Sequence, residues 1–269
     1  MVAHVMLFQG RTLVIALGLA AGAVLGADMF GIASLSGGGS LSGAPSVAAG
    51  GRTSTSTSAP PAVPASLVAR PTGPVIDIYA APGAGRPLAQ MPDVWLLNGD
   101  PSTPIPQVFL VIGQPSGSWV QVLLAQRPNG TKGWVRRQSV SLLTDRYRID
   151  VSIGSHTMSV HYGTSLLYQG PVATGAPATP TPLGEYYVRV LLRSPDPTSV
   201  YGPYAYGLSA HSDALTTFSG GDAEIGLHGN NDASALGHSV THGCVRMDNA
   251  EISALARILP LGTPVNLDP

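Results

Sequence analysis

The sequence predicts a mainly β protein with two folded, strand-rich regions and one helix near the C-terminal end. From residue 73 onward, short runs of β-branched, aromatic and aliphatic residues alternate with Gly, Pro and Asn turn signals. Hydrophobic residues make up 44% of the 269 residues, which is enough for a packed core. A single amphipathic helix pattern lies between Asp248 and Pro260.

The charge balance excludes one class of partner. Charged residues make up only 11% of the chain, against about 25% in an average globular protein. Lys and Arg number 14 and Asp and Glu number 15, for a formal net charge of -1. A protein that binds nucleic acid needs a basic patch or stripe. We therefore expect no nucleic-acid partner.

Residues 1–33 are expected to be a signal peptide or a membrane anchor. The uncharged run Thr12–Ala27 ends at Asp28. It is short for a membrane span of about 20 residues and long for a signal core of about 7–15 residues. Export to the cell envelope is the prediction, with the membrane contacted only through this segment. Cleavage and anchoring both stay open.

Residues 34–72 are expected to be a disordered linker. The segment consists mostly of Gly, Ser, Thr, Pro and Ala, and its only charged residues are Arg52 and Arg70. Such a composition cannot bury enough apolar surface to offset the entropy lost on ordering.

Residues 73–145 are expected to form a small closed β-barrel of about six strands. The Asn129-Gly130 pair is a strong hairpin signal before Gly133-Trp134-Val135. The order WVQVLLAQRPNGTKGWVRRQSV resembles the end of bacterial SH3-like domains. No catalytic cluster is visible, so a binding or positioning module is predicted. The strands expected are Val75–Tyr79, Gln107–Ile112 and Trp119–Leu124, and for Trp95, Trp119 and Trp134 core packing is favoured over a ligand groove.

Residues 146–269 are expected to form a second, mainly β domain. Asp248 can cap the single helix, with Glu251 three residues later in a capping-box pattern. The helix stripe is expected to be Ile252, Leu255, Ala256 and Leu259, and the strands Tyr147–Ile153, Thr157–Tyr162, Leu166–Ala173, Glu185–Leu192 and Val265–Leu267.

The chemistry is expected between Ile225 and Met247. Cys244 is the only cysteine, so no intramolecular disulfide can form. His242 precedes it by two residues and His228 by sixteen. A thiol needs a nearby base to become a nucleophile, and histidine titrates near neutral pH. Flanking glycines let backbone N–H groups approach a substrate carbonyl, and Arg246 could grip a carboxylate.

Three other interpretations of these residues stay open. The cysteine can be buried and inert, and the histidines can be structural. A zinc site built from His228, His238, His242 and Cys244 is disfavoured, because H-x-C is not a usual ligand spacing and no second cysteine exists. From these residues we expect no metal.

Two motifs carry a resemblance to a known family. The segments Ile225–Gly229 (IGLHG) and Thr241–Met247 (THGCVRM) resemble the signature of bacterial L,D-transpeptidase catalytic domains. A second family pattern, T-P-x-G-x-[F/Y], stands at Thr181–Tyr186. The resemblance covers about residues 146–269 and implies a β-sandwich with a mobile lid. The lid candidate is Tyr201–Gly221, whose tyrosines can face substrate or pack the core.

The resemblance also implies a two-step acyl transfer on peptidoglycan stem peptides. Cys244 would attack a diaminopimelate carbonyl and expel D-alanine, and a second diaminopimelate amine would take the acyl group in a 3→3 cross-link. His228 would be the base and the Gly229 carbonyl its orienting group. Gly243 and Cys244 would supply oxyanion-hole N–H groups, and carbapenems would acylate Cys244. The implied catalytic residues are Cys244, His228, Gly229, His242 and Gly243, and the implied substrate contacts are Arg246, Tyr204 and Tyr206. The family resemblance implies no metal or organic cofactor.

Two alternative functions remain from the sequence. Water can replace the acceptor amine, which gives an L,D-carboxypeptidase with the same site. A non-catalytic cell-wall-binding protein is the other alternative, although the intact pair of Cys244 and His228 argues against it. A monomer is expected.

Overall fold

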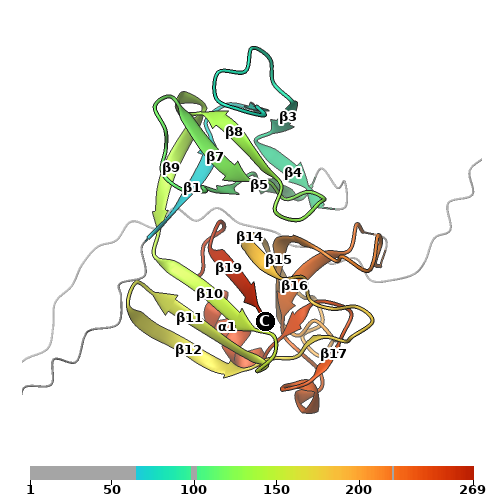
Figure 1. Ribbon diagram of the computed structural model, residues 1–269. Coiled ribbons are helices and arrows are strands. Elements are labelled where there is room, and N and C mark those ends of the chain that lie inside the picture. Colours follow the sequence, from blue (N-terminus) through green and yellow to red (C-terminus); the bar gives the residue numbers. More distant parts are fainter. Residues whose placement is uncertain (1–64, 98–101, 220) are drawn as a thin grey trace, which may run out of the picture. The chain divides into compact units, whose positions relative to one another are not determined.

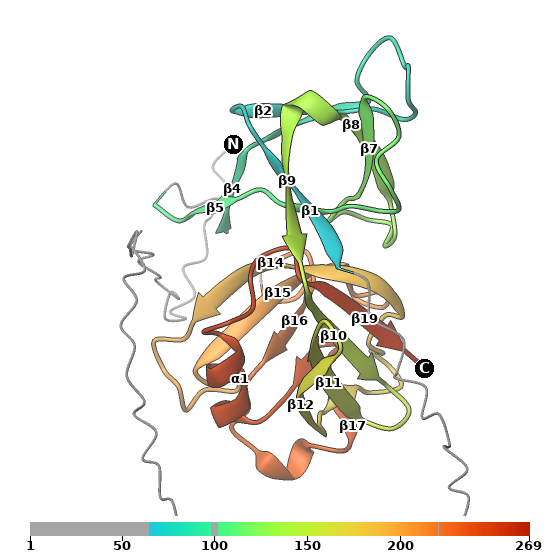
Figure 2. The ribbon, with the colours of Figure 1, turned by 90° about the vertical axis from the view of Figure 1, so that its left-hand side faces the viewer.

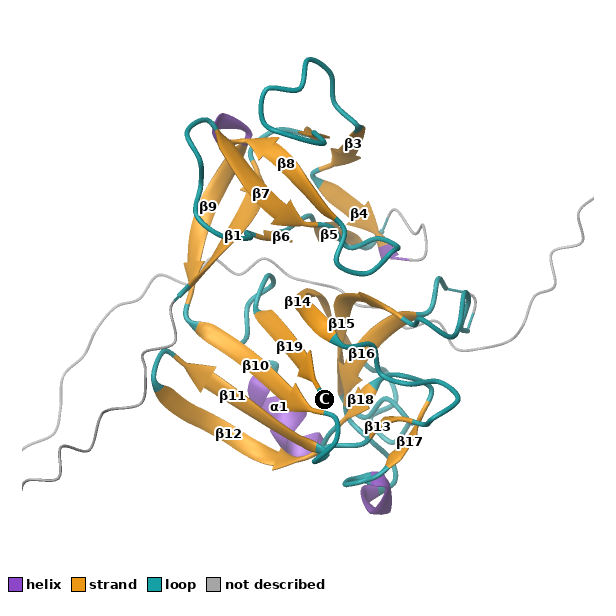
Figure 3. Ribbon diagram, viewed as in Figure 1, coloured by secondary structure: helices purple, strands orange, loops and turns teal. Residues whose placement is uncertain are grey.

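The computed structural model of the protein describes residues 65–97, 102–219 and 221–269. Strands dominate this part of the chain, as Figure 3 shows. The described residues contain one α-helix, α1 (Asn249–Leu255). The predicted export segment, residues 1–33, lies outside the described residues. Residues 34–64 of the predicted linker also lie outside them. In the described part, no helix is both long enough and apolar enough to cross a membrane.

The N-terminal region, residues 66–145, is built from short antiparallel strands (Figure 1). Strand β1 lies between β6 and β9, and the other strands form the pairs β2–β3, β4–β5 and β7–β8. An apolar core, which includes Ile76, Phe109, Val120 and Val135, unites all of these strands except the β4–β5 pair. Closure as an SH3-like barrel stays a prediction. The strands are β1 (Ser66–Pro71), β2 (Val75–Ile78), β3 (Ala89–Pro92), β4 (Val94–Leu96), β5 (Pro104–Pro106), β6 (Phe109–Leu110), β7 (Trp119–Leu123), β8 (Lys132–Arg136) and β9 (Val140–Asp145), with a 3₁₀ turn at Arg137–Ser139.

Two sequence expectations need correction in this region. The linker was expected to run to residue 72, but Ser66–Pro71 forms β1 and pairs along its whole length with β9. Its buried residues, Val68 and Ala69, are too few to show a periodicity. The strand expected at Gln107–Ile112 is only the two-residue β6. In contrast, the Asn129-Gly130 hairpin between β7 and β8 is confirmed, with Gly130 at φ +78°.

The tryptophans of this region differ in burial. Trp119 is buried, with Tyr79 edge-on at 5.0 Å between ring centroids and the Arg136 guanidinium 4.1 Å above its ring. Trp95 and Trp134 are half-buried. Core packing therefore describes Trp119 well and the other two only in part.

The C-terminal region, residues 146–269, is organised by one eight-stranded sheet in the order β12-β11-β10-β19-β14-β15-β16-β18. The pairs β10–β19 and β16–β18 are parallel and the others are antiparallel. The sheet curls around its core, as Figures 1 and 2 show. Strand β14 joins its two halves, because Gly184–Tyr187 pairs with β19 and Val188–Arg193 pairs with β15. Its strands are β10 (Tyr147–Ser152), β11 (Thr157–Tyr162), β12 (Ser165–Pro171), β14 (Gly184–Arg193), β15 (Tyr204–His211), β16 (Glu224–His228), β18 (Val245–Arg246) and β19 (Pro264–Asp268). A separate parallel pair consists of β13 (Thr174–Gly175) and β17 (Ser239–Thr241), and a 3₁₀ turn spans Ala233–Ala235.

The helix begins at the predicted cap. The Asp248 carboxylate accepts hydrogen bonds from the backbone N–H groups of Ala250 and Glu251, which satisfies two of the free donors at the helix start. Ile252 and Leu255 bury the apolar face of α1 in the core. The helix ends at Leu255, before the expected stripe is complete, and Leu259 reaches the core from the turns that follow.

A third apolar cluster joins the two regions. Val68 and Leu110 of the N-terminal region pack with Tyr187 of β14, and Leu261 packs against them. Gly262 adopts φ +96°, and a Cβ on it would lie 2.4 Å from Val68 Cγ1. The close approach of β1 to the C-terminal region therefore requires glycine at this position.

Replacement of Gly262 by Ala is expected to destabilise the fold by about 2–4 kcal/mol, because it adds left-handed backbone strain and a steric clash. Val68→Ala should recover only the part due to the clash. The free energy of unfolding of both single variants and the double variant separates the two contributions. Additive effects of the two substitutions would contradict a direct contact.

Candidate active site

The parallel pairing of β16 with β18 brings the two halves of the motif together. Leu227 lies opposite Val245 and His228 opposite Arg246, so the preceding Gly226 is next to Cys244. The Gly226 N–H donates to Cys244 Sγ at 3.3 Å. A Cβ on Gly226 would lie 3.5 Å from His228 Cδ2 and 3.7 Å from Cys244 Sγ. The thiol and the imidazole therefore flank one backbone position that carries no side chain.

His228 is held in one tautomer. Its Nδ1 lies 2.7 Å from the Gly229 carbonyl oxygen, which can only accept, so Nδ1 carries the hydrogen and Nε2 the lone pair. The residue is 2% exposed, and burial lowers the pKa of His228 to about 4. The Gly229 hydrogen bond raises this pKa and the Arg246 charge lowers it further. At neutral pH the imidazole is uncharged and Nε2 can accept a proton.

The Gly229 carbonyl is fixed by its surroundings. The Gly229 N–H donates to the Tyr204 carbonyl at 3.1 Å, and the next N–H, of Asn230, donates to Asn249 Oδ1 at 2.8 Å. A Cβ on Gly229 would lie 2.9 Å from the Gly202 Cα and closer still to Asn249 Oδ1. Only glycine fits, and this packing aims the carbonyl at His228.

Cys244 is a protonated thiol in the resting protein. Burial raises the pKa of Cys244, and the Gly226 N–H and the Arg246 charge lower it in part. Because the His228 pKa is low and the Cys244 pKa is high, a resting thiolate–imidazolium pair is disfavoured. A reaction of this thiol as a nucleophile would therefore require the loss of its proton.

A hydroxyl closes the turn that carries Cys244. Thr241 Oγ1 accepts from the Gly243 N–H at 3.1 Å and donates to the Cys244 carbonyl at 2.6 Å. Thr181 Oγ1, from the second motif, donates to the Gly243 carbonyl at 2.9 Å. The second motif therefore supports the cysteine turn directly. The Gly243 N–H, expected in the oxyanion hole, is engaged by Thr241 in this structure.

Cys244, His228 and His242 line one pocket, together with Arg246, Tyr201 and Phe218. His242 is exposed, and its ring centroid lies 5.5 Å from that of Phe218. The ring centroid of Tyr201 lies 5.0 Å from that of His228. The structure thus brings five sequence-predicted residues into one place: Cys244, His228, His242, Gly243 and Arg246, with Gly229 behind His228.

The two tyrosines expected to contact substrate lie elsewhere. Tyr206 is fully buried, and its hydroxyl donates to the Leu255 carbonyl at 2.8 Å. Tyr204 packs against the same core. Both belong to β15, so this strand takes up eight residues of the expected lid, and the loop that follows it is residues 212–219 and 221–223. Tyr201 is the tyrosine that faces the pocket.

Sequence reasoning missed a charged pair in the adjoining cleft. Glu224 lies on the same face of β16 as Gly226 and His228, since side chains alternate along a strand. Arg189 Nη1 lies 3.1 Å from Glu224 Oε1, and burial raises the pKa of Glu224 to about 7. Because side chains alternate along a strand, Glu224 could have been predicted to lie on the same face of the strand as His228. No local feature of the sequence indicates that Arg189 lies beside it.

In residues 65–97, 102–219 and 221–269, no three His, Cys, Asp or Glu side chains are grouped to hold a metal ion. The zinc alternative therefore gains no support from the described geometry.

Comparison with known proteins identifies the family. The sequence profile of the L,D-transpeptidase catalytic domain (YkuD) matches residues 146–267. The chain is 31% identical over 152 residues to YkuD of Bacillus subtilis (strain 168), which covers 54% of this chain and 84% of that protein. The chain belongs to the L,D-transpeptidase family.

The chain is also similar to a second relative and to a solved structure. YkuD of Bacillus licheniformis is 34% identical over 123 residues, and the match covers 46% of this chain and 66% of that protein. An L,D-transpeptidase structure from Mycobacterium smegmatis is 15% identical, with a TM-score of 0.39 over 60% of this chain and 90% of that one.

The hydrogen bonds of the Thr241 hydroxyl are expected to control the reactivity of Cys244. Thr241→Val removes both hydrogen bonds of the hydroxyl and leaves buried polar groups unpaired, at a local cost of about 1–3 kcal/mol. We expect alkylation of Cys244 by iodoacetamide to slow about 10-fold or more, because the thiol moves away from the Gly226 N–H. Thr241→Ser is the matched control and should keep most of the rate. A wild-type rate in Thr241→Val would contradict the role of the hydroxyl.

Proposed function

We propose that the protein is an L,D-transpeptidase that joins peptidoglycan stem peptides, with Cys244 as nucleophile and His228 as base. One observation carries the proposal. The thiol and the imidazole flank Gly226, and the His228–Gly229 hydrogen bond leaves Nε2 as the proton acceptor. This is the logic of a nucleophile, a base and an orienting group, with a backbone carbonyl as the third member.

The first half-reaction forms a thioester. Cys244 Sγ attacks the diaminopimelate carbonyl of a donor tetrapeptide while His228 Nε2 takes the thiol proton. The tetrahedral intermediate collapses, the bond to the terminal D-alanine breaks, and His228 returns the proton to the leaving amine. Because the resting thiol is protonated, proton transfer accompanies C–S bond formation.

The second half-reaction transfers the acyl group. The side-chain amine of diaminopimelate on another stem attacks the thioester and loses a proton to His228. The Cys244 thiolate leaves and is reprotonated, and a 3→3 cross-link has formed. No step requires a metal or an organic cofactor.

Backbone and side-chain groups complete the site. The oxyanion is assigned to the N–H groups of Cys244 and Gly243, and the Gly243 N–H must exchange its Thr241 acceptor for substrate. Arg246 lines the pocket, and its buried Nε has no partner in the described structure, so it suits a substrate carboxylate. We place His242 and Tyr201 in the pocket wall.

Residues 1–33 would direct export, because peptidoglycan lies outside the membrane.

Mass analysis of the products tests the reaction class. Disaccharide-tetrapeptide incubated with the protein should give a cross-linked dimer and free D-alanine, and Cys244→Ala should give neither while keeping its fold by circular dichroism. Tripeptide monomer in place of dimer means that water is the acceptor and replaces the transferase proposal by the carboxypeptidase. Unchanged substrate with folded wild-type protein would overturn both.

The pH dependence tests the role of His228. Burial lowers the pKa of His228 to about 4, so the imidazole stays neutral, and active as a base, well below its ordinary titration range. We expect the rate of Cys244 acylation by a carbapenem, followed by intact mass, to be flat from about pH 8 to 5 and to fall below that. A fall centred near pH 6.5 would contradict this.

Two variants accompany the pH profile. His228→Gln should acylate slowly at neutral pH and recover as pH rises toward the thiol pKa, which burial raises. His238→Gln changes a histidine that does not line the pocket and should keep the wild-type profile.

A further inference from the structure

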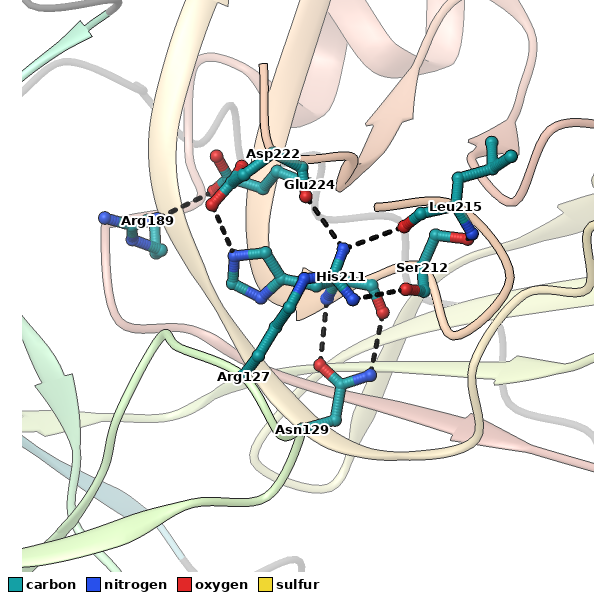
Figure 4. A network of polar contacts seen from close by, with 8 residues as sticks. All are labelled: Arg127, Asn129, Arg189, His211, Ser212, Leu215, Asp222 and Glu224. Carbon is teal, nitrogen blue, oxygen red and sulfur yellow. Dashed lines mark hydrogen bonds and ion pairs between the residues drawn. The ribbon is translucent and has the colours of Figure 1, made fainter. Parts of the chain in front are cut away.

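The hairpin between β7 and β8 of the N-terminal region contacts the loop of residues 212–219 and 221–223, which lines the candidate active site (Figure 4). Arg127 Nη1 donates to the Ser212 carbonyl at 2.6 Å. Its Nη2 donates to the carbonyls of Leu215 at 2.9 Å and Asp222 at 2.8 Å. One guanidinium therefore joins the beginning, the middle and the end of the loop 212–219 and 221–223.

A second hairpin residue holds the end of strand β15. Asn129 Nδ2 donates to the His211 carbonyl at 2.7 Å, and the His211 N–H donates to Asn129 Oδ1 at 2.9 Å. The side-chain amide thus pairs with both backbone groups of one residue, as a neighbouring strand would. Asn129 Nδ2 also lies 3.0 Å from Asp213 Oδ1.

The loop held in this way forms part of the pocket. Leu215 and Phe218 line it together with Cys244, and Phe218 lies over His242. The loop leads directly into β16, where Glu224 pairs with Arg189 and His228 follows four residues later. A change in the path of the loop would therefore alter the pocket wall without changing the Cys244–Gly226 contact.

The loop also has local contacts, but most of them lie at its two ends. Ser212 Oγ accepts from the N–H groups of Ala214 at 3.2 Å and Leu215 at 3.0 Å, and His211 Nε2 lies 3.0 Å from Asp222 Oδ2. Residues 213–219, 221 and 222 are exposed apart from Leu215, which is half-buried. Its ends are joined by the Ser212 N–H to the Ala223 carbonyl at 2.9 Å, and its tip by the paired backbones of Phe218 and Gly221. Segments with little buried apolar surface open most readily, so contacts from outside the loop add substantially to its order.

We propose that Arg127 and Asn129 are positioning residues, which hold the active-site loop in its substrate-binding shape and so make the N-terminal region part of the enzyme. The consequence for substrate rests on the proposed function, whereas the order of the loop does not. Hydrogen bonds from a charged donor to carbonyls are about twice as strong as neutral ones, and one planar fork specifies three acceptors at once.

Hydrogen–deuterium exchange of the full chain tests the contact. In Arg127→Ala and Asn129→Ala, amides of residues 213–219 and 221–222 should exchange about 10-fold faster, while those of β10 and β11 stay unchanged. Lys132→Ala is the matched control, since it removes an exposed positive charge from the same hairpin. Arg127→Lys should be intermediate, because one ammonium cannot reach three carbonyls. Unchanged exchange in both alanine variants overturns the proposal.

Steady-state kinetics test the consequence. We expect KM for disaccharide-tetrapeptide to rise about 10-fold in Arg127→Ala with kcat within about twofold, and iodoacetamide alkylation of Cys244 to stay at the wild-type rate. Faster exchange with an unchanged KM would overturn the link to substrate binding. A wild-type protein that leaves the peptide unchanged overturns the proposed function, and exchange then still decides whether Arg127 and Asn129 order the loop.

Discussion

The geometry of the site depends on the pairing of the five-residue strand β16 with the two-residue strand β18. Strand β18 has only two residues, Val245 and Arg246, and it is held from both sides. On one side it pairs with β16, and the Met247 N–H donates to the His228 carbonyl at 2.9 Å. On the other side, Arg246 and Ala173 exchange two backbone hydrogen bonds, each of 2.9 Å. These bonds fix Cys244 beside Gly226, and the chemistry of the motif follows from that register.

Burial then sets the protonation states in the site. Desolvation lowers the pKa of His228 to about 4 and raises the pKa of Cys244, so both groups are uncharged when the protein is at rest. No thiolate–imidazolium ion pair then has to be broken before the thiol reacts. In the proposed reaction, negative charge develops on sulfur close to the Gly226 N–H and the positively charged Arg246, which can both stabilise it.

The sequence predicted those elements whose structure is determined by interactions between residues close together in the chain. Strand β11 begins and ends where expected, at Thr157 and Tyr162, and Asp248 caps α1. The spacing of His228 and Cys244 indicated the pair, since strand ends and a glycine turn are local features. Strand β1 was missed because its order depends on β9, about seventy residues away. The pairing of β19, at the end of the chain, in parallel with β10 was not predicted for a similar reason. Tyr206 was assigned to the wrong face because a tyrosine-rich stretch does not reveal which residues of β15 point into the core.

The contact between the hairpin and the loop shows why the pattern of residue types in the sequence could not predict the path of the loop that lines the pocket. Arg127 and Asn129 bind mostly main-chain groups of residues 211–222, and a carbonyl oxygen is the same in every residue. Such bonds specify the path of a backbone and leave its side chains free. The loop between Leu215 and Asp222 can therefore change side chains that line the pocket, such as Phe218, while the hairpin keeps the path of its backbone. The physical constraint lies in the N-terminal region, whereas the side chains of the pocket wall can vary in the loop that it holds.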